Sequence, residues 1–101
     1  MPTRPFEYHP EAIKEAWEAY HWYDERSDTA AEDFWQELRR ARQSVVERPQ
    51  LGGPYLHGTK CRRLKRFPYG LIYVERAKRI IGVAVAHLRR SPGYWRHRLA
   101  E

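Results

Sequence analysis

Apolar residues in the first half of the chain recur with the spacing of amphipathic helices. Phe6–His9 has the pattern of a short strand, and Pro10 suits the first turn of a helix because its missing N–H would be unpaired there. From Pro10 to about Glu25 the apolar side chains follow an i, i+3, i+4, i+7 pattern, which predicts one buried helix face. That face is expected to contain Ile13, Ala16, Trp17 and Tyr20.

A second helix is predicted by its start and stop signals. Three consecutive residues are competent N-caps: Ser27, Asp28 and Thr29. Thr29 with Glu32 also matches a capping box, so the helix is expected to begin at one of the three. Helical spacing then continues up to Pro49, and the two helices would form an antiparallel hairpin with a tight connection. The buried positions are predicted to be Ala31, Phe34, Trp35, Leu38, Ala41 or Arg42, and Val45.

The second half of the chain changes from helical to strand patterning. Residues 49–60 contain three Gly and two Pro without periodicity, which indicates a loop. Strands are predicted at 61–66, 70–75 and 79–86, with a bend at 67–69 and a turn at 76–78. The run 80–86 is apolar without alternation, as expected for a central strand covered on both faces, and Gly82 indicates a close backbone approach.

These elements predict an α+β sandwich in one domain spanning residues 1–101. The helical hairpin would cover one face of a small, mostly antiparallel sheet. The other face is expected to stay open, concave and basic.

Charge is divided unevenly along the chain. Residues 1–48 hold 7 Lys and Arg against 11 Asp and Glu, whereas residues 49–101 hold 12 against 2. The two parts therefore carry about −4 and +10. This asymmetry favours a basic face suited to nucleic acid or to an acidic protein, and the alternative is a merely soluble basic surface.

Several classes of site and location are disfavoured by composition. Cys61 is the only cysteine, which excludes an intramolecular disulfide and fits a reducing cytoplasm. No apolar run suits secretion or membrane spanning, so a soluble cytoplasmic protein without membrane contact is expected. No phosphate-binding, dinucleotide or zinc-protease motif occurs, and neither a metal nor a cofactor is predicted. The helical acids are expected to face solvent: Glu15, Glu18, Asp24, Glu25, Glu32, Asp33 and Glu37.

Two basic segments are candidates for function. In the strand 61–66, alternation puts Arg62 and Arg66 on one side and Arg63 and Lys65 on the other. Their spacing along a strand suits successive phosphates, although charges that protect an edge strand would give the same pattern.

The other segment, residues 87–98, interleaves four arginines and two histidines with Tyr94 and Trp95. Aromatic rings that stack on unpaired bases, with arginines on phosphate, are typical of single-stranded nucleic-acid sites. The alternative is that both rings pack the tail onto the core. RNA cleavage without metal also needs an acid and a base, roles that His87 and Tyr94 could fill, although a single histidine at a strand end is more often structural.

The chain resembles the RelE/ParE toxin superfamily over most of residues 6–98. The resemblance rests on FEYHPEAIKEAWEAYHWYDERS, on Arg62-Arg63 with Arg66-Phe67-Pro68-Tyr69, and on Val83-Ala84-Val85-Ala86-His87 with Arg89-Arg90, Pro92 and Tyr94-Trp95. It implies a β-α-α-β-β-β microdomain and the growth-inhibiting, plasmid-stabilising toxin of an operon-encoded pair. A small antitoxin with an acidic or amphipathic segment would neutralise it.

Members of this superfamily differ in target. Some are endoribonucleases that cleave messenger RNA in the ribosomal A site, which is the expected activity here; others poison DNA gyrase without an enzymatic step, and an inactive nucleic-acid- or antitoxin-binding module is a third possibility. The resemblance departs at Leu88, near the position of one catalytic arginine. The expected catalytic residues are His87, Arg63, Arg90 and Tyr94. The expected contacts to nucleic acid or target are Arg62, Lys65, Arg66, Arg89, Arg96 and Arg98.

Overall fold

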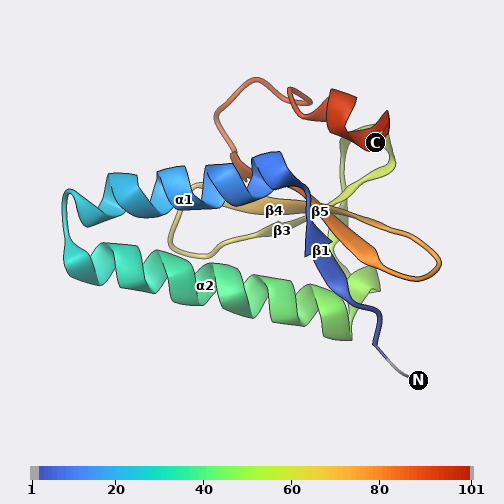
Figure 1. Cartoon of the computed structure of the whole chain (residues 1–101), viewed down its shortest axis with the longest axis horizontal. Coiled ribbons are helices and arrows are strands. Elements are labelled where there is room, and N and C mark those ends of the chain that lie inside the picture. Colours follow the sequence, from blue (N-terminus) through green and yellow to red (C-terminus); the bar gives the residue numbers. More distant parts are fainter. Residues whose placement is uncertain (1–2, 101) are drawn as a thin grey trace.

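A helical hairpin lies on one face of a mixed sheet in the structure, a computed structural model that describes residues 3–100 (Figure 1). The helices are α1 (Pro10–Asp24) and α2 (Asp28–Glu47). Within the described residues the strands are β1 (Phe6–Tyr8), β2 (Gly53–Pro54), β3 (Lys60–Arg63), β4 (Tyr69–Glu75) and β5 (Ile80–His87). This architecture confirms the predicted α+β fold, while the domain limits at residues 1 and 101 lie outside the described part and stay a prediction.

The sheet has the order β1-β5-β4-β3-β2. Only the pairing of β1 with β5 is parallel in the described sheet; the other neighbours are antiparallel. The two-residue strand β2 pairs Gly53 with Cys61 and Pro54 with Lys60 inside the predicted loop. It was missed because two residues cannot display an alternating pattern. In residues 3–100, no helix is both long and apolar enough to cross a lipid bilayer.

Side chains outside the helices cap both helix starts. The Nδ1 atom of His9 accepts a hydrogen bond from the N–H of Glu11 at 3.1 Å, so the first strand ends one residue earlier than predicted. Ser27 is the N-cap of α2, and its hydroxyl accepts from the N–H of Ala30 at 3.2 Å. Thr29 lies inside the helix, so the capping-box alternative was wrong.

The buried face of α1 differs from the predicted one. Ile13 is 45% exposed and Trp17 is 47% exposed. Ala16 is buried as predicted, and the other buried residues of α1 are Ala12 and Ala19. Small side chains let the helix lie close to β5, while the ring of Trp17 packs on Trp35 of α2 at a centroid separation of 4.8 Å. The face of α2 was predicted correctly at Ala31, Phe34, Leu38, Ala41 and Val45.

The second face of the sheet is covered, and the prediction of an open basic face was wrong. The segment after β5 crosses this face and ends in a short 3-10 helix, η3 (Arg96–Ala100) (Figure 1). Trp95, 1% exposed, packs there against side chains of β4 and β5, including Ile72 and Val83. The alternative reading of Trp95 as a core residue is thereby confirmed. β5 is buried from both sides, as its apolar run predicted.

Two details of the sheet bear on the site. The predicted strand 61–66 ends at Arg63 because Leu64 turns into the core and donates its N–H to the carbonyl of Tyr69 at 2.9 Å. At Gly82 a Cβ atom would lie 2.7 Å from Cζ of Phe6, which confirms the predicted close approach.

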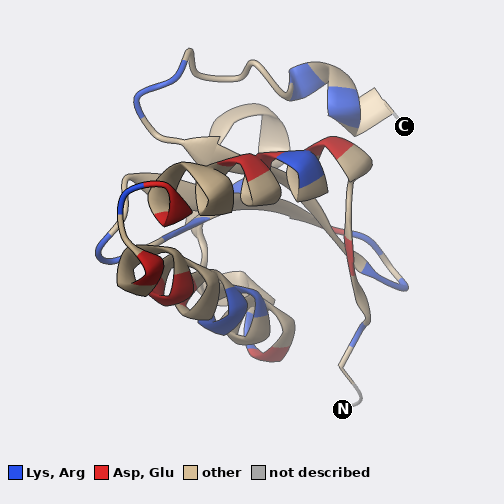
Figure 2. Ribbon diagram, turned by 60° about the vertical axis from the view of Figure 1, so that its left-hand side comes forward, with Lys and Arg blue, Asp and Glu red and all other residues tan. Residues whose placement is uncertain are grey.

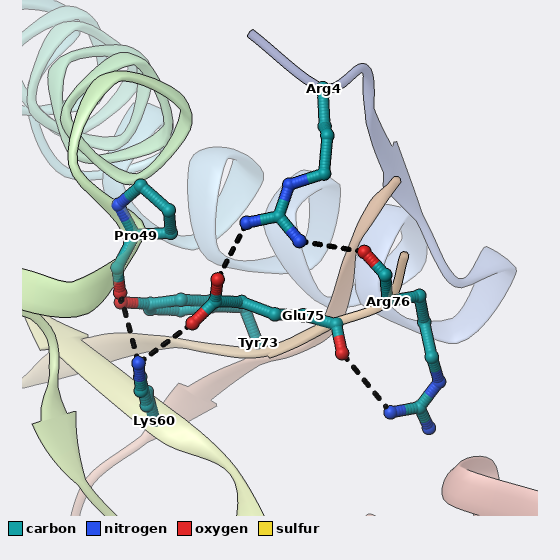
Figure 3. A network of polar contacts seen from close by, with 6 residues as sticks. All are labelled: Arg4, Pro49, Lys60, Tyr73, Glu75 and Arg76. Atoms are coloured by element: carbon teal, nitrogen blue, oxygen red, sulfur yellow. Dashed lines mark hydrogen bonds and ion pairs between the residues drawn. The ribbon is translucent and has the colours of Figure 1, made fainter. Parts of the chain in front are cut away.

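At the C-terminal end of β4, Glu75 links the N-terminal segment to β3 through ion pairs (Figure 3). Its carboxylate pairs with Arg4 at 2.5 Å and with Lys60 at 2.7 Å. Lys60 also donates to the carbonyl of Pro49 at 3.5 Å, the same oxygen that accepts from the hydroxyl of Tyr73 at 2.5 Å. Hydrogen bonds from Lys60 and Arg4 lower the pKa of Glu75.

We expect Glu75→Gln to lower the free energy of unfolding at neutral pH by about 1–2 kcal/mol, since charge-assisted hydrogen bonds are lost at a partly exposed site. Because the pKa of Glu75 is lowered in the folded state, its contribution is present above the unfolded pKa of about 4.3 and is lost as pH falls. Urea unfolding between neutral pH and pH about 3 should therefore bring wild type and variant together. A stability difference that stays constant over this range would contradict the assignment.

Candidate functional site

The predicted catalytic residues fall into two separate regions. His87, Arg90 and Tyr94 line one cavity of about 410 Å³, which we call the aromatic cavity because Trp22, Tyr23 and Tyr69 also line it. Arg63 lines a larger cavity of about 830 Å³, which we call the basic groove. The groove is lined by α2 and by the end of β3 with the turn after it, including Arg40, Arg62, Lys65 and Arg66. The structure thus brings together three of the four and separates Arg63 from them.

Glu15 of α1 organises the wall of the aromatic cavity. Its side chain is 10% exposed and accepts hydrogen bonds from the N–H of Val85 at 3.1 Å and from both terminal nitrogens of Arg98 at 2.8 and 3.1 Å. The hydroxyl of Tyr94 also donates to this carboxylate. Arg90 lies 3.7 Å away as a further cation. Glu15 therefore fixes the segment after β5 to α1.

Two expectations about this region need correction. Glu15 was expected to face solvent, and Arg98 was expected to contact a target, but Arg98 is buried and also donates to the carbonyl of Val83 at 3.0 Å. The reason lies in the short β1, which ends at Tyr8 opposite Gly82. Past that point the backbone of β5 has no neighbouring strand on this side, and Glu15 and Arg98 bond its free N–H and C=O groups.

The neighbours of Tyr94 hold its hydroxyl as a hydrogen-bond donor to Glu15. Burial, and then the hydrogen bond to the Glu15 carboxylate, raise the pKa of Tyr94 well above its ordinary value. The guanidinium of Arg90 lies 3.8 Å from the centroid of its ring. A phenol that donates to a carboxylate in this way keeps its proton, so it is poorly placed to protonate a leaving group.

His87 lies at the end of β5, opposite Tyr69 of β4. Its Nδ1 atom accepts from the N–H of Arg89 at 3.1 Å, and its ring meets the edge of Tyr69 at a centroid distance of 5.1 Å. The Nε2 atom has no hydrogen bond within residues 3–100, which leaves it free for a ligand. Arg89 and Arg96 are exposed in the segment that follows β5, and their contact with a target stays a prediction.

Among the cations of the basic groove, Arg66 is the one that pairs with Glu37. Its carboxylate accepts from the backbone N–H groups of Lys65 and Arg66 and pairs with the side chain of Arg66 at 3.0 Å. Burial acts to raise the pKa of Glu37, but these hydrogen bonds outweigh it and leave the pKa lowered. Glu37 was expected in solvent and is instead buried. Arg66, which also lies 3.4 Å from Asp33, is therefore committed within the chain.

The remaining cations of the groove are unpaired in the described part of the chain. Arg63, Lys65 and Arg40 are exposed, and Arg62 is half-buried. They flank apolar side chains that include Leu51, which is 53% exposed. Figure 2 shows the Lys and Arg of the C-terminal segment lying apart from those along α2. Residues 3–100 contain no group of His, Cys, Asp and Glu that could hold a metal ion.

Comparisons with known proteins show the fold and the family of this chain. The fold is similar to that of a chain titled "Chromosomal ParDE TA system from P. aeruginosa", with a TM-score of 0.74 and 13% identity over 86% of this chain and 98% of that chain. The family model described as ParE toxin of type II toxin-antitoxin system, parDE, matches residues 6–92. The chain therefore belongs to the ParE toxin family, which confirms the resemblance to the RelE/ParE superfamily. A search of curated protein sequences gave no match.

Proposed function

We propose that this ParE-family toxin arrests growth by binding DNA gyrase without an enzymatic step, and that a small cognate antitoxin neutralises it. The proposal favours gyrase poisoning, an alternative in the sequence analysis, over the messenger RNA cleavage expected first. The observation that carries it is the role of Glu15 in the aromatic cavity.

RNA cleavage without metal needs a base, an acid and cations that stabilise a charged phosphorane. In the aromatic cavity, the proton of Tyr94 is directed to Glu15, and Arg90 lies 3.7 Å from the same carboxylate. Glu18 adds a second negative charge to the lining. A phosphate would meet the carboxylate of Glu18 there, while Arg90 and Arg98 are already engaged with Glu15, and only His87 remains as an uncommitted acid or base.

The basic groove supports binding without chemistry. Its free cations, among them Arg62, Arg63 and Lys65, lie beside apolar side chains. Glu37 is the only carboxylate among the described residues that line the groove, and it pairs with Arg66. Guanidinium groups grip phosphates or carboxylates in two places, and exposed apolar side chains add contact area. This combination suits an acidic protein surface or the DNA that gyrase holds.

Removing two positive charges from the basic groove should weaken gyrase poisoning. In a supercoiling assay with purified gyrase, wild type should cause cleaved plasmid to accumulate, and Arg63→Ala with Lys65→Ala should reduce the effect about tenfold or more, since two charged anchors are lost. Arg76→Ala with Lys78→Ala is the matched control, because both lie in the exposed turn after β4 and leave the groove intact. No cleaved plasmid at toxin excess would contradict the proposal.

Ribosome-dependent cleavage of messenger RNA remains the competing function because His87, Arg90 and Tyr94 line one cavity. New A-site cuts on translating ribosomes that disappear in His87→Ala would establish it in place of gyrase poisoning. Normal growth at high expression without a partner would instead favour an inactive binding module.

The antitoxin is expected to bind through an acidic or amphipathic segment. Because residues 49–101 carry about +10, charge attraction should steer and anchor that segment. The dissociation constant of the complex should therefore rise as salt increases from low to high ionic strength, as titration calorimetry would measure. An affinity that does not change with salt would contradict the electrostatic account.

A further inference from the structure

The aromatic cavity is rich in aromatic rings, which the proposed binding of gyrase through the basic groove does not use. Four aromatic rings line it, from Trp22 and Tyr23 of α1, Tyr69 of β4 and Tyr94 of the C-terminal segment. Trp22 is 51% exposed, and the guanidinium of Arg26 covers one face of its ring. A volume of about 410 Å³ is sufficient for one long side chain, being near the lower end of ligand-binding cavities.

The lining of the aromatic cavity contains one unpaired carboxylate, that of Glu18, beside the ion pairs that Glu15 makes with Arg90 and Arg98. Glu18 is exposed at its lining and has no hydrogen bond or ion pair with any residue of 3–100. Glu15 contributes a second carboxylate, which Arg98 neutralises from the buried side. The pKa of Tyr69 is raised first by burial and then by Tyr23, Glu18 and Glu15, consistent with a negative potential at its hydroxyl.

The chain's own arginines show what these rings accept. The guanidinium of Arg90 lies 3.8 Å from the ring centroid of Tyr94, and that of Arg26 lies 3.6 Å from the ring of Trp22. Cations stack favourably on aromatic faces at such distances. Arg90 lines the cavity and Arg26 does not, and the volume of about 410 Å³ lies beside Arg90 and Glu18.

We propose that the aromatic cavity binds an arginine side chain of a protein partner. The planar guanidinium would lie against the rings of Trp22 and Tyr69 and donate hydrogen bonds to the carboxylate of Glu18. This site goes beyond the proposed function, because it recognises a cation whereas the basic groove recognises acidic groups. It gives the toxin two binding sites of opposite charge preference.

A direct test uses N-acetyl-arginine amide as the probe and the full chain in solution. Titration followed by NMR should shift the indole signal of Trp22 and the ring signals of Tyr69, and the citrulline analogue, which is neutral, should shift neither. Glu18→Gln should weaken the probe's affinity about fivefold to tenfold through loss of a charge-assisted hydrogen bond. Glu32→Gln is the matched control, an exposed acid of α2 outside the cavity.

The proposal is overturned if citrulline and arginine probes shift the signals equally, or if Glu18→Gln and Glu32→Gln behave alike. It is also overturned if inorganic phosphate produces the same shifts as the arginine probe, since the cavity would then be an anion site. Neither gyrase nor DNA is present in the experiment. Its failure is therefore independent of a failure to trap gyrase.

Discussion

Trp95→Ala is expected to lower the free energy of unfolding by about 3–5 kcal/mol, the usual cost of removing a fully buried large aromatic ring. The ring is 1% exposed and holds the C-terminal segment on the second face of the sheet, beside Tyr55 and Val83. Because natural domains are stable by only about 5–15 kcal/mol, this loss is a large part of the total. Urea unfolding followed by circular dichroism measures it.

The matched control is Trp22→Ala, since Trp22 is 51% exposed and its truncation leaves no buried cavity. Surface substitutions of this kind change stability by about 0.5 kcal/mol or less, although loss of the Arg26 contact adds a small term. Equal destabilisation by Trp95→Ala and Trp22→Ala would show that the C-terminal segment does not pack a core against the second face of the sheet.

Glu15→Ala should cost a similar amount, about 3–5 kcal/mol, because it leaves the buried guanidinium of Arg98 without its counter-charge. It also removes the acceptor for the N–H of Val85. Hydrogen exchange at the Val85 amide should therefore accelerate more than at core amides of β5 such as that of Ala84. Trypsin should cut sooner in the C-terminal segment, as mass spectrometry of timed digests would reveal.

Glu18→Ala provides the comparison for Glu15→Ala, because it removes an exposed carboxylate one turn further along α1. Its effect on unfolding should stay within about 0.5 kcal/mol. If both glutamates gave this small change, the ion pair with Arg98 would not hold the segment in solution.

Much of the fold could be predicted because strong periodicity reports burial directly. The spacing of Phe34, Leu38 and Val45 located the buried face of α2, and the unbroken apolar run 80–86 identified a strand covered on both sides. The face of α1 was partly misassigned because the large side chains of Ile13, Trp17 and Tyr20 outweighed Ala12 and Ala19 in the pattern. Alanines bury little area, yet they allow the closest approach of helix and sheet.

The site was harder to predict because its key contacts join distant parts of the chain. Glu15 was taken for a solvated acid, although its place within the alanine face, between Ala12 and Ala19, was an available signal. Its partner Arg98 looked like one more cation of a basic tail. Which cations are free depends on which acids reach them, and the sequence alone does not contain that information. The catalytic roles of His87, Arg63, Arg90 and Tyr94 stay predictions.

The short β1 has a consequence for the behaviour of the isolated toxin. A strand edge with free N–H and C=O groups is a template for pairing with another molecule. Past Tyr8, this edge of β5 is occupied at Val83 and Val85 by the side chains of Arg98 and Glu15. The toxin is thereby protected at this edge against strand exchange and fibre-like aggregation with other copies of itself, a protection that requires neither a longer strand nor a bound partner.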